Sequence, residues 1–435
     1  MERFALSRMK EWKENENRKP LIIRGARQVG KTWIMKTFGQ QYFEKTAYVN
    51  FDNNARMKQV FEGDLDIERL VLSISAETGV SIEAENTLII FDEVQEVPKA
   101  LTSLKYFYEN APQYAIVAAG SLLGVALHQG TSFPVGKVDF LDLYPLNFRE
   151  FLCAMGEKQF VSMLDSCDTQ MVTVFKTKYI ERLREYYFVG GMPEVVKDFS
   201  EKKDYNRVRA IQKNLINYYQ QDFSKHAEIK LVPRLNLVWN SIPMQLAKEN
   251  KKYIYGQVRE GSRAKDFELA IQWLLDCGLI HKVQRIQKPD LPLKAYIDFD
   301  AFKLFLVDIG LLIAMTDLDA KVIIEGNKIF TEFNGSLTEQ YILQQLISDV
   351  GVIPYYYSTQ NSKGEIDFLV QGKTSVIPIE VKAEENLKAK SLKAFCEKYQ
   401  PSYAVRTSMS DYREQDWMTN IPLYAIKWIE NYVNQ

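Results

Sequence analysis

The segment GARQVGKT, at residues 25–32, constrains the possible fold more than any other part of the chain. It follows the apolar run LII and precedes WIMKTF, which indicates a short strand, a glycine-rich turn and a helix in that order. Gly25 and Gly30 allow the backbone to curl so that its N–H groups, and the positive end of the helix, point toward a phosphate. A loop of this kind connects the end of a buried strand to the start of a helix, so the segment predicts an α/β protein.

The residue types in this loop point to a nucleoside triphosphate. Lys31 can reach the β- and γ-phosphates, and the Thr32 hydroxyl can coordinate Mg²⁺. The alternative is a chance glycine-rich turn, which the strand and helix on either side make less plausible. We therefore expect ATP and Mg²⁺ as cofactors, bound by the residues of the loop: Gly25, Ala26, Arg27, Gln28, Val29, Gly30, Lys31 and Thr32.

A second motif, TLIIFDEVQ at residues 87–95, completes the predicted site. Its apolar strand ends in Asp92, which we expect beside the magnesium, and Glu93 is placed to orient or deprotonate the attacking water. Ser121 ends another apolar run, YAIVAAGS, where it either senses the γ-phosphate or caps a helix. Arg149 is a candidate for a trans-acting arginine, although an exposed helical arginine is the commoner case.

Apolar runs alternate with amphipathic stretches from Pro20 to about Leu152. The runs at 21–26, 47–52, 87–93 and 114–121 are short and end in turn or helix signals, which predicts a parallel sheet covered on both faces. A length of 435 residues indicates about three domains. We place them at 1–155, 156–287 and 288–435.

Composition excludes several classes of protein. The four cysteines and three histidines are scattered, which argues against a disulfide framework or a zinc site and favours a reducing, cytoplasmic setting. The apolar runs at 114–128 and 304–315 are too short or too interrupted to span a membrane. Residues 201–290 carry 17 Lys and Arg against 10 Asp and Glu, a weak indication of phosphate binding.

The middle of the chain shows a helical pattern and then a winged-helix pattern at about 236–287. A helix carrying Phe267, Ile271 and Leu274 is followed by an alternating strand, LIHKVQRI. Basic residues at the start of this presumed recognition helix would meet DNA: Arg259, Arg263 and Lys265. Winged helices also serve as protein-contact modules, and Trp273 is expected in the core.

Five motifs together, GARQVGKT, LIIFDEVQ, AAGS, PLNFREFL and GGMPEVV, resemble bacterial and archaeal AAA+-type ATPases that carry a second domain of uncharacterised function. The resemblance covers essentially the whole chain. It implies an AAA+/ASCE-like P-loop core with a parallel sheet, a helical plus winged-helix middle, and a C-terminal domain. It implies no particular substrate.

The C-terminal third contains a pattern similar to PD-(D/E)xK nucleases, whose fold is α/β and restriction-endonuclease-like. Asp367 lies in GEIDFLV, and Glu380 and Lys382 lie two apart in IPIEVKA, so they share one face of a strand. Glu339, on the preceding helix, would be the helical acid. Glu339, Asp367 and Glu380 are candidate Mg²⁺ ligands, with Asp367, Glu380 and Lys382 catalytic. The alternative is a hairpin with a surface salt bridge, or a nuclease fold without activity.

The leading hypothesis is an ATPase, with Lys31 and Glu93 as catalytic residues, that couples hydrolysis of Mg-ATP to the binding or processing of DNA. The alternative is a nucleotide-dependent switch that recruits a protein partner or self-associates, with an inactive nuclease-like domain. DNA stimulation of turnover and a steep salt dependence would favour the first. A change of shape or oligomeric state on adding ATP would favour the second.

Overall fold

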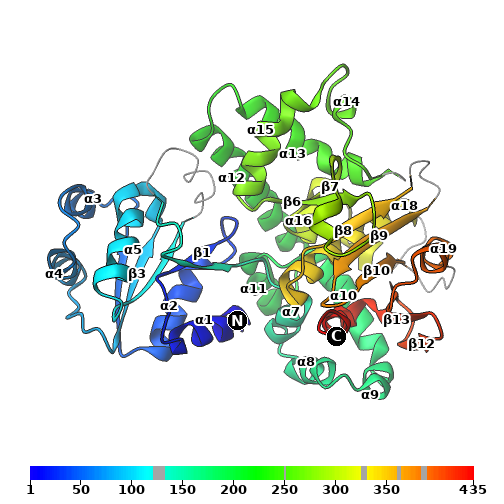
Figure 1. The fold of residues 1–435 in the computed structure, drawn as a ribbon, viewed down its shortest axis with the longest axis horizontal. Helices are drawn as coiled ribbons and strands as arrows, with labels where there is room; N and C mark the ends of the chain where they lie inside the picture. Colours follow the sequence, from blue (N-terminus) through cyan, green and yellow to red (C-terminus); the bar gives the residue numbers. More distant parts are fainter. Residues whose placement is uncertain (121–132, 249–250, 325–330, 360–363, 384–388) are drawn as a thin grey trace. The chain divides into compact units, whose positions relative to one another are not determined.

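The computed structural model describes residues 1–120, 133–248, 251–324, 331–359, 364–383 and 389–435, drawn in Figure 1. These residues form two compact units. The N-terminal unit consists of Glu2–Tyr144 with Asp276–Leu279, and the C-terminal unit consists of Met1, Pro145–Leu275 and Ile280–Gln435. The three-domain division at residues 155 and 287 stays a prediction.

A five-stranded sheet forms the centre of the N-terminal unit, and every pair of neighbouring strands is parallel. The order is β2-β3-β4-β1-β5, with bounds Leu21–Arg24 (β1), Lys45–Asn50 (β2), Thr87–Asp92 (β3), Ala115–Ala119 (β4) and Asp139–Asp142 (β5). The predicted parallel sheet is confirmed, since the four apolar runs form β1 to β4. The sequence analysis missed β5, because two aspartates interrupt its apolar pattern.

Helices cover this sheet because its central strands are apolar on both faces. All six residues of β3 are buried. Phe91 contacts Phe51 and Phe61 edge to face, and these rings pack with α3 and α5 residues in one apolar core. The helical elements of the unit are α1 (Ala5–Glu14), α2 (Lys31–Tyr42), α3 (Ala55–Glu62), α4 (Ile67–Thr78), the 3₁₀ turn η1 (Val94–Glu96) and α5 (Pro98–Asn110).

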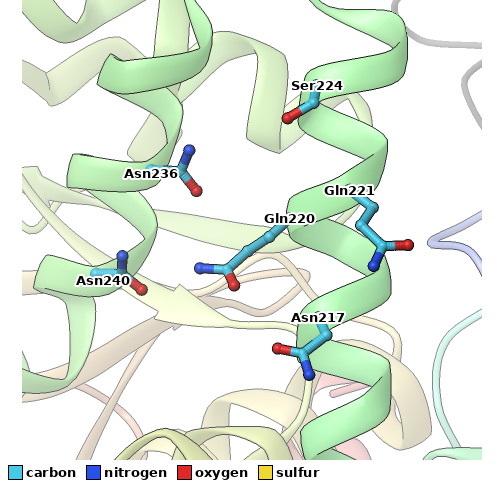
Figure 2. A pocket seen from close by; sticks show the side chains of 6 residues that line it. All are labelled: Asn217, Gln220, Gln221, Ser224, Asn236 and Asn240. Carbon is cyan, nitrogen blue, oxygen red and sulfur yellow. The ribbon is translucent and has the colours of Figure 1, made fainter.

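The first part of the C-terminal unit is helical, as predicted. Its helices are α7 (Phe148–Ala154), α8 (Lys158–Asp165), α9 (Thr169–Val174), α10 (Lys176–Val189), α11 (Pro193–Lys202), α12 (Tyr205–His226), α13 (Val232–Leu246), α14 (Tyr255–Val258) and α15 (Ala264–Asp276). Trp239 of α13 contacts Tyr219 and Phe223 of α12, which holds these two long helices together. Figure 2 shows a hollow between the polar faces of the same two helices.

An eight-stranded mixed sheet organises the rest of this unit, in the order β12-β13-β11-β10-β9-β8-β6-β7. Its strands are β6 (Ile280–Ile286), β7 (Ile297–Leu306), β8 (Tyr355–Ser358), β9 (Glu365–Gln371), β10 (Val376–Val381), β11 (Val405–Ser408), β12 (Arg413–Gln415) and β13 (Met418–Pro422). The remaining elements are η2 (Leu293–Tyr296), α16 (Ile309–Met315), α17 (Ala320–Ile324), α18 (Thr331–Gln345), η4 (Leu346–Val350), α19 (Lys390–Tyr399), η5 (Leu423–Ile429) and α20 (Glu430–Val433).

The strand predicted for the wing is present as β6, but it belongs to this large sheet. It pairs with β7 antiparallel and with β8 in parallel, so its neighbours come from beyond the predicted boundary at 287. The alternation of LIHKVQRI shows that a strand forms, yet it carries no information about which strands pair with it. The winged-helix assignment therefore stays a prediction.

Neither membrane spans nor disulfides are found in the described residues. No helix there is long and apolar enough to cross a bilayer. The cysteines at 153, 167, 277 and 396 are free thiols.

Candidate functional site: the phosphate loop and the C-terminal charge cluster

The loop between β1 and α2 adopts the curled conformation that its glycines predict. Gly25 has φ 147°, Gln28 has φ 65° and Gly30, the residue before α2, has φ 96°. A Cβ on Gly25 would lie 2.1 Å from the carbonyl oxygen of Leu143, so only glycine fits there. The backbone N–H groups at the start of α2 are thereby directed into the concave side of the loop, where an anion binds.

Arg3 holds the loop from the outside. Its guanidinium donates to the carbonyl oxygen of Val29 at 3.0 Å and to that of Tyr144 at 2.6 Å. The Arg3 side chain is buried, at 5 % exposed. The sequence analysis missed Arg3 because nothing in the N-terminal pattern ties it to a loop 26 residues away. Its role is to hold the loop backbone in place.

Lys31, the first residue of α2, lies inside the loop. Its ammonium donates to the carbonyl oxygens of Gly25 at 2.9 Å and Ala26 at 2.7 Å. Burial lowers the pKa of Lys31 to about 8, against the opposing attraction of Glu93 and Asp92. The side chain is therefore mostly charged at neutral pH and poorly solvated, which favours exchange of its carbonyl partners for phosphate oxygens.

Thr32 and Asp92 meet at the carboxyl edge of the sheet. The Thr32 hydroxyl donates to Oδ2 of Asp92 at 2.7 Å, and the Tyr48 hydroxyl donates to the same oxygen at 2.9 Å. Asp92 is 3 % exposed, and burial beside its carboxylate raises the pKa of Tyr48. The sequence analysis missed Tyr48. A polar residue in the apolar run AYVNFD, two positions before Asn50 on the same strand face, was the available signal.

Glu93 follows Asp92 in a left-handed backbone conformation, with φ 52°. Its N–H donates to Oδ1 of Asp92 at 3.1 Å, and Gln95 Nε2 donates to Glu93 Oε2 at 2.7 Å. A left-handed conformation in a non-glycine residue is strained and clusters at functional sites. Gln95, which the sequence analysis did not single out, holds the carboxylate in one orientation.

These side chains fit a magnesium nucleotide. A curled loop at a helix N-terminus offers N–H donors for phosphates, and Lys31 adds a positive charge beside them. The oxygens of Thr32 and Asp92, 2.7 Å apart, are hard ligands that can reach one cation or its water shell. Ser121, the proposed γ-phosphate sensor, lies outside the described residues.

In the C-terminal unit, β9 and β10 are the antiparallel pair that the sequence predicts. Phe368 lies opposite Ile379, and continuing this register by one residue sets Asp367 opposite Glu380. The Asp367 carboxylate accepts the backbone N–H of Val381 at 2.7 Å. The Glu339 carboxylate of α18 lies close enough to raise the pKa of Asp367. The structure thus brings Asp367 together with Glu339, and places Glu380 on the adjoining strand.

Two lysines that the sequence analysis missed lie against these acids. Lys251 forms an ion pair with Glu339, and Lys303 of β7 forms ion pairs with Glu365 and, at 3.5 Å, with Glu339. The Lys303 side chain is 1 % exposed. Burial raises the pKa of Glu339, but the two lysines outweigh it and the pKa falls below its usual value. No local pattern marks these lysines, because they come from segments 36 or more residues away from Glu339.

Glu380 and Lys382 form a separate pair. Lys382 Nζ lies 2.7 Å from Glu380 Oε1, and Glu380 is 4 % exposed while the Lys382 side chain is 32 % exposed. Among the residues that the structure describes, no group of three or more His, Cys, Asp or Glu is arranged to hold a metal ion. The metal-binding and catalytic roles of Glu339, Asp367, Glu380 and Lys382 stay predictions.

The half-buried Asp367 predicts a pH dependence of stability. Burial and the nearby Glu339 raise its pKa from 3.8 to about 7. A carboxyl whose pKa is higher in the folded state than in the unfolded state stabilises the fold at pH values below the unfolded-state pKa. This stabilisation is lost as the pH rises through the folded-state pKa. We expect this contribution to the thermal midpoint to decline between about pH 4 and pH 7, and the decline to be smaller in Asp367→Asn. Thermal melts across this range test it; equal slopes in both proteins would contradict it.

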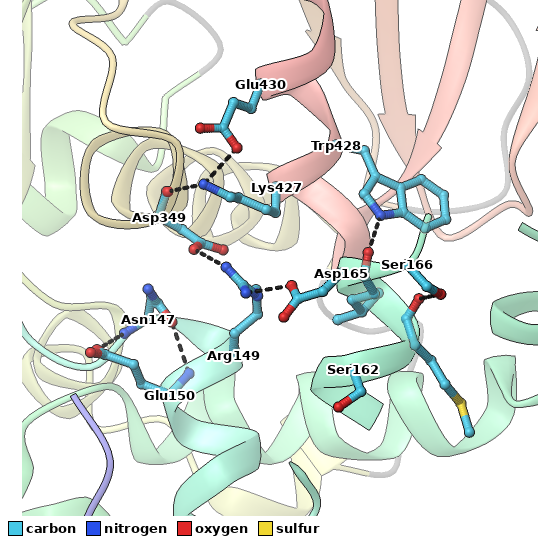
Figure 3. Close-up of polar contacts among 12 residues, drawn as sticks. Asn147, Arg149, Glu150, Ser162, Asp165, Ser166, Asp349, Lys427, Trp428 and Glu430 are labelled. Atoms are coloured by element: carbon cyan, nitrogen blue, oxygen red, sulfur yellow. Dashed lines mark hydrogen bonds and ion pairs between the residues drawn. The ribbon is translucent and has the colours of Figure 1, made fainter. Parts of the chain in front are cut away.

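The Arg149 side chain is not exposed, in contrast to the interpretation of it as an exposed helical arginine. Its side chain is 12 % exposed and forms ion pairs with Asp349, at 2.9 Å, and with Asp165 (Figure 3). It lies in α7, whose first turn is fixed by a capping box between Asn147 and Glu150. Arg149 therefore joins α7 to α8 and to η4, and its role as a trans-acting arginine stays a prediction.

The basic residues proposed for DNA contact, Arg259, Arg263 and Lys265, are exposed. Trp273 is 7 % exposed and contacts Phe223 edge to face, so it is a core residue as expected.

Comparison with known families identifies three segments. The family model described as AAA domain matches residues 17–152. Two models described as domains of unknown function, DUF8612 and DUF4143, match residues 180–322 and 334–426. No curated protein matches the chain.

Several solved structures are similar at low identity. The Walker-type ATPase PABY2304 of Pyrococcus abyssi is 15 % identical, with 72 % of this chain and 95 % of that chain covered and a TM-score of 0.44. The Aeropyrum pernix Orc1 protein in complex with DNA is 14 % identical, with 72 % and 91 % covered and a TM-score of 0.27. The RuvB Holliday junction branch migration motor of Thermotoga maritima is 11 % identical, with 64 % and 87 % covered and a TM-score of 0.28.

The parallel sheet, the curled loop at the start of α2 and the AAA-domain match over residues 17–152 together support an AAA+-type ATPase.

Proposed function

We propose that the N-terminal unit binds Mg-ATP and hydrolyses it to ADP and phosphate. The observation that carries this proposal is the convergence of Lys31, the Thr32–Asp92 pair and the Glu93–Gln95 pair at one edge of the sheet. The phosphates lie in the loop of residues 25–32. Thr32 and Asp92 would hold the magnesium or its water shell, and the cation would neutralise charge on the phosphates.

Lys31 and Glu93 have different roles in the proposed hydrolysis. Lys31 leaves the carbonyl oxygens of Gly25 and Ala26 and donates to phosphate oxygens, where it balances their charge. Glu93, held by Gln95, accepts a proton from the attacking water. The hydrogen bond from Gln95 orients this carboxylate before the substrate arrives.

We further propose that hydrolysis is coupled to nucleic acid, through binding rather than cleavage. The excess of Lys and Arg in residues 201–290 supports binding. The exposed Arg259, Arg263 and Lys265 of the predicted winged helix are one surface for it. Against cleavage, Lys251 and Lys303 already neutralise Glu339, and Lys382 pairs with Glu380.

The nucleotide switch remains the second candidate, and the same lysines favour it. This alternative includes a nuclease-like domain that is inactive. Ion pairs between lysines of the chain and Glu339 support it, because they neutralise an acid that would otherwise bind a metal ion. Under this alternative, bound ATP changes the shape or oligomeric state of the protein, and slow hydrolysis returns it to the starting state.

The test is steady-state ATP turnover, with and without DNA, for wild type and Lys31→Ala. We expect Lys31→Ala to lose turnover, because the ammonium that balances phosphate charge is gone. We expect DNA to stimulate the wild type, less so at high salt. Turnover unaffected by DNA, with an ATP-dependent change in size by light scattering, would favour the switch. Magnesium-dependent DNA cleavage lost in Asp367→Ala would restore the nuclease roles.

A further inference from the structure

A polar hollow lies between α12 and α13 in the C-terminal unit (Figure 2). Its volume is about 630 Å³. Five carboxamides and one hydroxyl line it, four from α12 and two from α13: Asn217, Gln220, Gln221, Ser224, Asn236 and Asn240. The lining therefore contains no charged and no apolar side chain, and a ligand that fits must be rich in uncharged hydrogen-bonding groups.

The hydrogen-bonding capacity of this lining is mostly unused by the protein. Within the described part of the chain, the only hydrogen bond of these six side chains runs from Asn236 Nδ2 to the carbonyl oxygen of Val232, at 3.1 Å. Gln220 of α12 and Asn240 of α13 point toward one another across the hollow (Figure 2). Each free carboxamide offers two donors and an acceptor side by side. The hollow can therefore pair with groups that present a donor next to an acceptor.

Aromatic contacts hold together the two helices that line the hollow. Trp239, from α13, contacts Tyr219 and Phe223 of α12 at ring-centroid distances of 6.1 Å and 6.0 Å, and all three rings are buried. Gln220 lies three residues before Phe223, and Asn236 lies three residues before Trp239, so these carboxamides are neighbours of the aromatic contact on the helix surface. The aromatic contacts therefore fix the spacing of the two helix backbones before a ligand binds.

The surroundings of the hollow are cationic and include an exposed aromatic ring. Residues 205–246 contain six lysines and arginines and two acidic residues. Two of the six, Arg207 and Lys213, form ion pairs with Asp198 and Asp317 outside this segment. Lys225, Lys230 and Arg234, at the end of the helical hairpin, are exposed. Tyr218, next to Asn217 on α12, is 47 % exposed. Cationic side chains for phosphates, a ring for stacking and carboxamides for base edges are the three components of single-strand recognition.

We propose that this hollow binds the bases of single-stranded nucleic acid. Carboxamides at Gln220, Asn236 and Asn240 pair with base edges, and Tyr218 stacks on a neighbouring base. Adenine suits the site best, since a carboxamide pairs in bidentate fashion with its N6 and N7 atoms. Lys225, Lys230 and Arg234 contact phosphates without regard to sequence. This proposal rests on the proposed coupling to nucleic acid. It places the nucleic-acid contact at the hollow between α12 and α13, which is a different surface from the predicted winged helix.

The experiment measures binding of the full chain to short labelled homopolymers of deoxyadenosine, thymidine and riboadenosine, by fluorescence anisotropy at several salt concentrations. The double variant Gln220→Met, Asn240→Leu keeps side-chain size but removes the hydrogen bonds. We expect it to bind the adenine oligomers about tenfold more weakly, with an unchanged salt dependence. The double variant Lys225→Gln, Arg234→Gln should weaken all oligomers alike and reduce the salt dependence. The two adenine oligomers distinguish DNA from RNA as the source of the bases.

Asn206→Leu is the matched control, because Asn206 is an exposed amide of α12 outside the hollow and should leave binding unchanged. Equal binding of wild type and the hollow variant would overturn the assignment of the site and leave the coupling to nucleic acid intact. Absence of any oligonucleotide binding by wild type would overturn both, while ATP turnover that depends on Lys31 would still stand. A polypeptide that binds in the hollow and is not displaced by any of the oligonucleotides would also overturn the proposal.

Discussion

Glu93→Gln is expected to stop ATP turnover while ATP still binds. The amide keeps the size of the side chain and its contact with Gln95, but it cannot accept a proton from the attacking water. A positioned general base contributes about 10²- to 10⁴-fold, so turnover should fall by about that factor. Steady-state phosphate release measures the loss, and equilibrium binding of a labelled ATP measures what is retained.

The control for this variant is Glu96→Gln. Glu96 is exposed in the same short 3₁₀ turn, η1, three residues further along, and should leave turnover unchanged. Lys31→Ala supplies the contrast, because it should lose binding as well as turnover. Unchanged turnover in Glu93→Gln would remove Glu93 from the mechanism, and loss of ATP binding in that variant would show that its role is structural.

Asp349→Ala is expected to destabilise the C-terminal unit by about 3–5 kcal/mol, because it removes one partner of a buried ion pair. Asp349 has a side chain 6 % exposed and lies 2.9 Å from Arg149, whose side chain is 12 % exposed (Figure 3). Burial raises the pKa of Asp349, and Arg149 and Lys427 oppose this shift. Without the carboxylate, the arginine loses the less exposed of its two acidic partners and keeps its ion pair with Asp165.

Chemical denaturation of the full chain measures this loss, with a probe in the C-terminal unit. Glu181→Ala is the matched control, since Glu181 forms an exposed pair with Lys178, at 3.1 Å, on α10 of the same unit. Exposed pairs are worth about 0–1 kcal/mol, so little change is expected. The double variant Arg149→Leu, Asp349→Leu should recover most of the stability. A loss in Asp349→Ala no larger than that in Glu181→Ala would contradict the buried-pair interpretation.

Local patterns were sufficient where neighbouring residues decide the structure. Strands β1, β3 and β4 appear as apolar runs because both faces of a parallel sheet are buried, whereas β5 was missed because Asp139 and Asp142 break its pattern. In the C-terminal unit GEIDFLV and IPIEVKA were expected as strands, and they form β9 and β10, which pair antiparallel. The alternation in β6 could not reveal that this strand joins β7 and β8.

The residues that hold the candidate sites in place were the least predictable from sequence. Arg3 reaches Val29 over 26 positions, and Lys251 reaches Glu339 over 88. Arg149 was interpreted from its local motif as an exposed or trans-acting side chain, yet Asp349, 200 positions away, determines its environment. Such contacts depend on how helices and strands pack, and no spacing within one segment encodes them.

The sequence by itself determined the phosphate loop and the acidic end of β3, because a glycine-rich turn between a buried strand and a helix has few other conformations. Only the tertiary structure decided that Tyr48 shares Asp92 with Thr32, and that Lys251 and Lys303 neutralise Glu339. The physical reason is range: backbone conformation follows from adjacent residues, while the charge and hydrogen-bond partners of a buried side chain come from segments that only folding brings together.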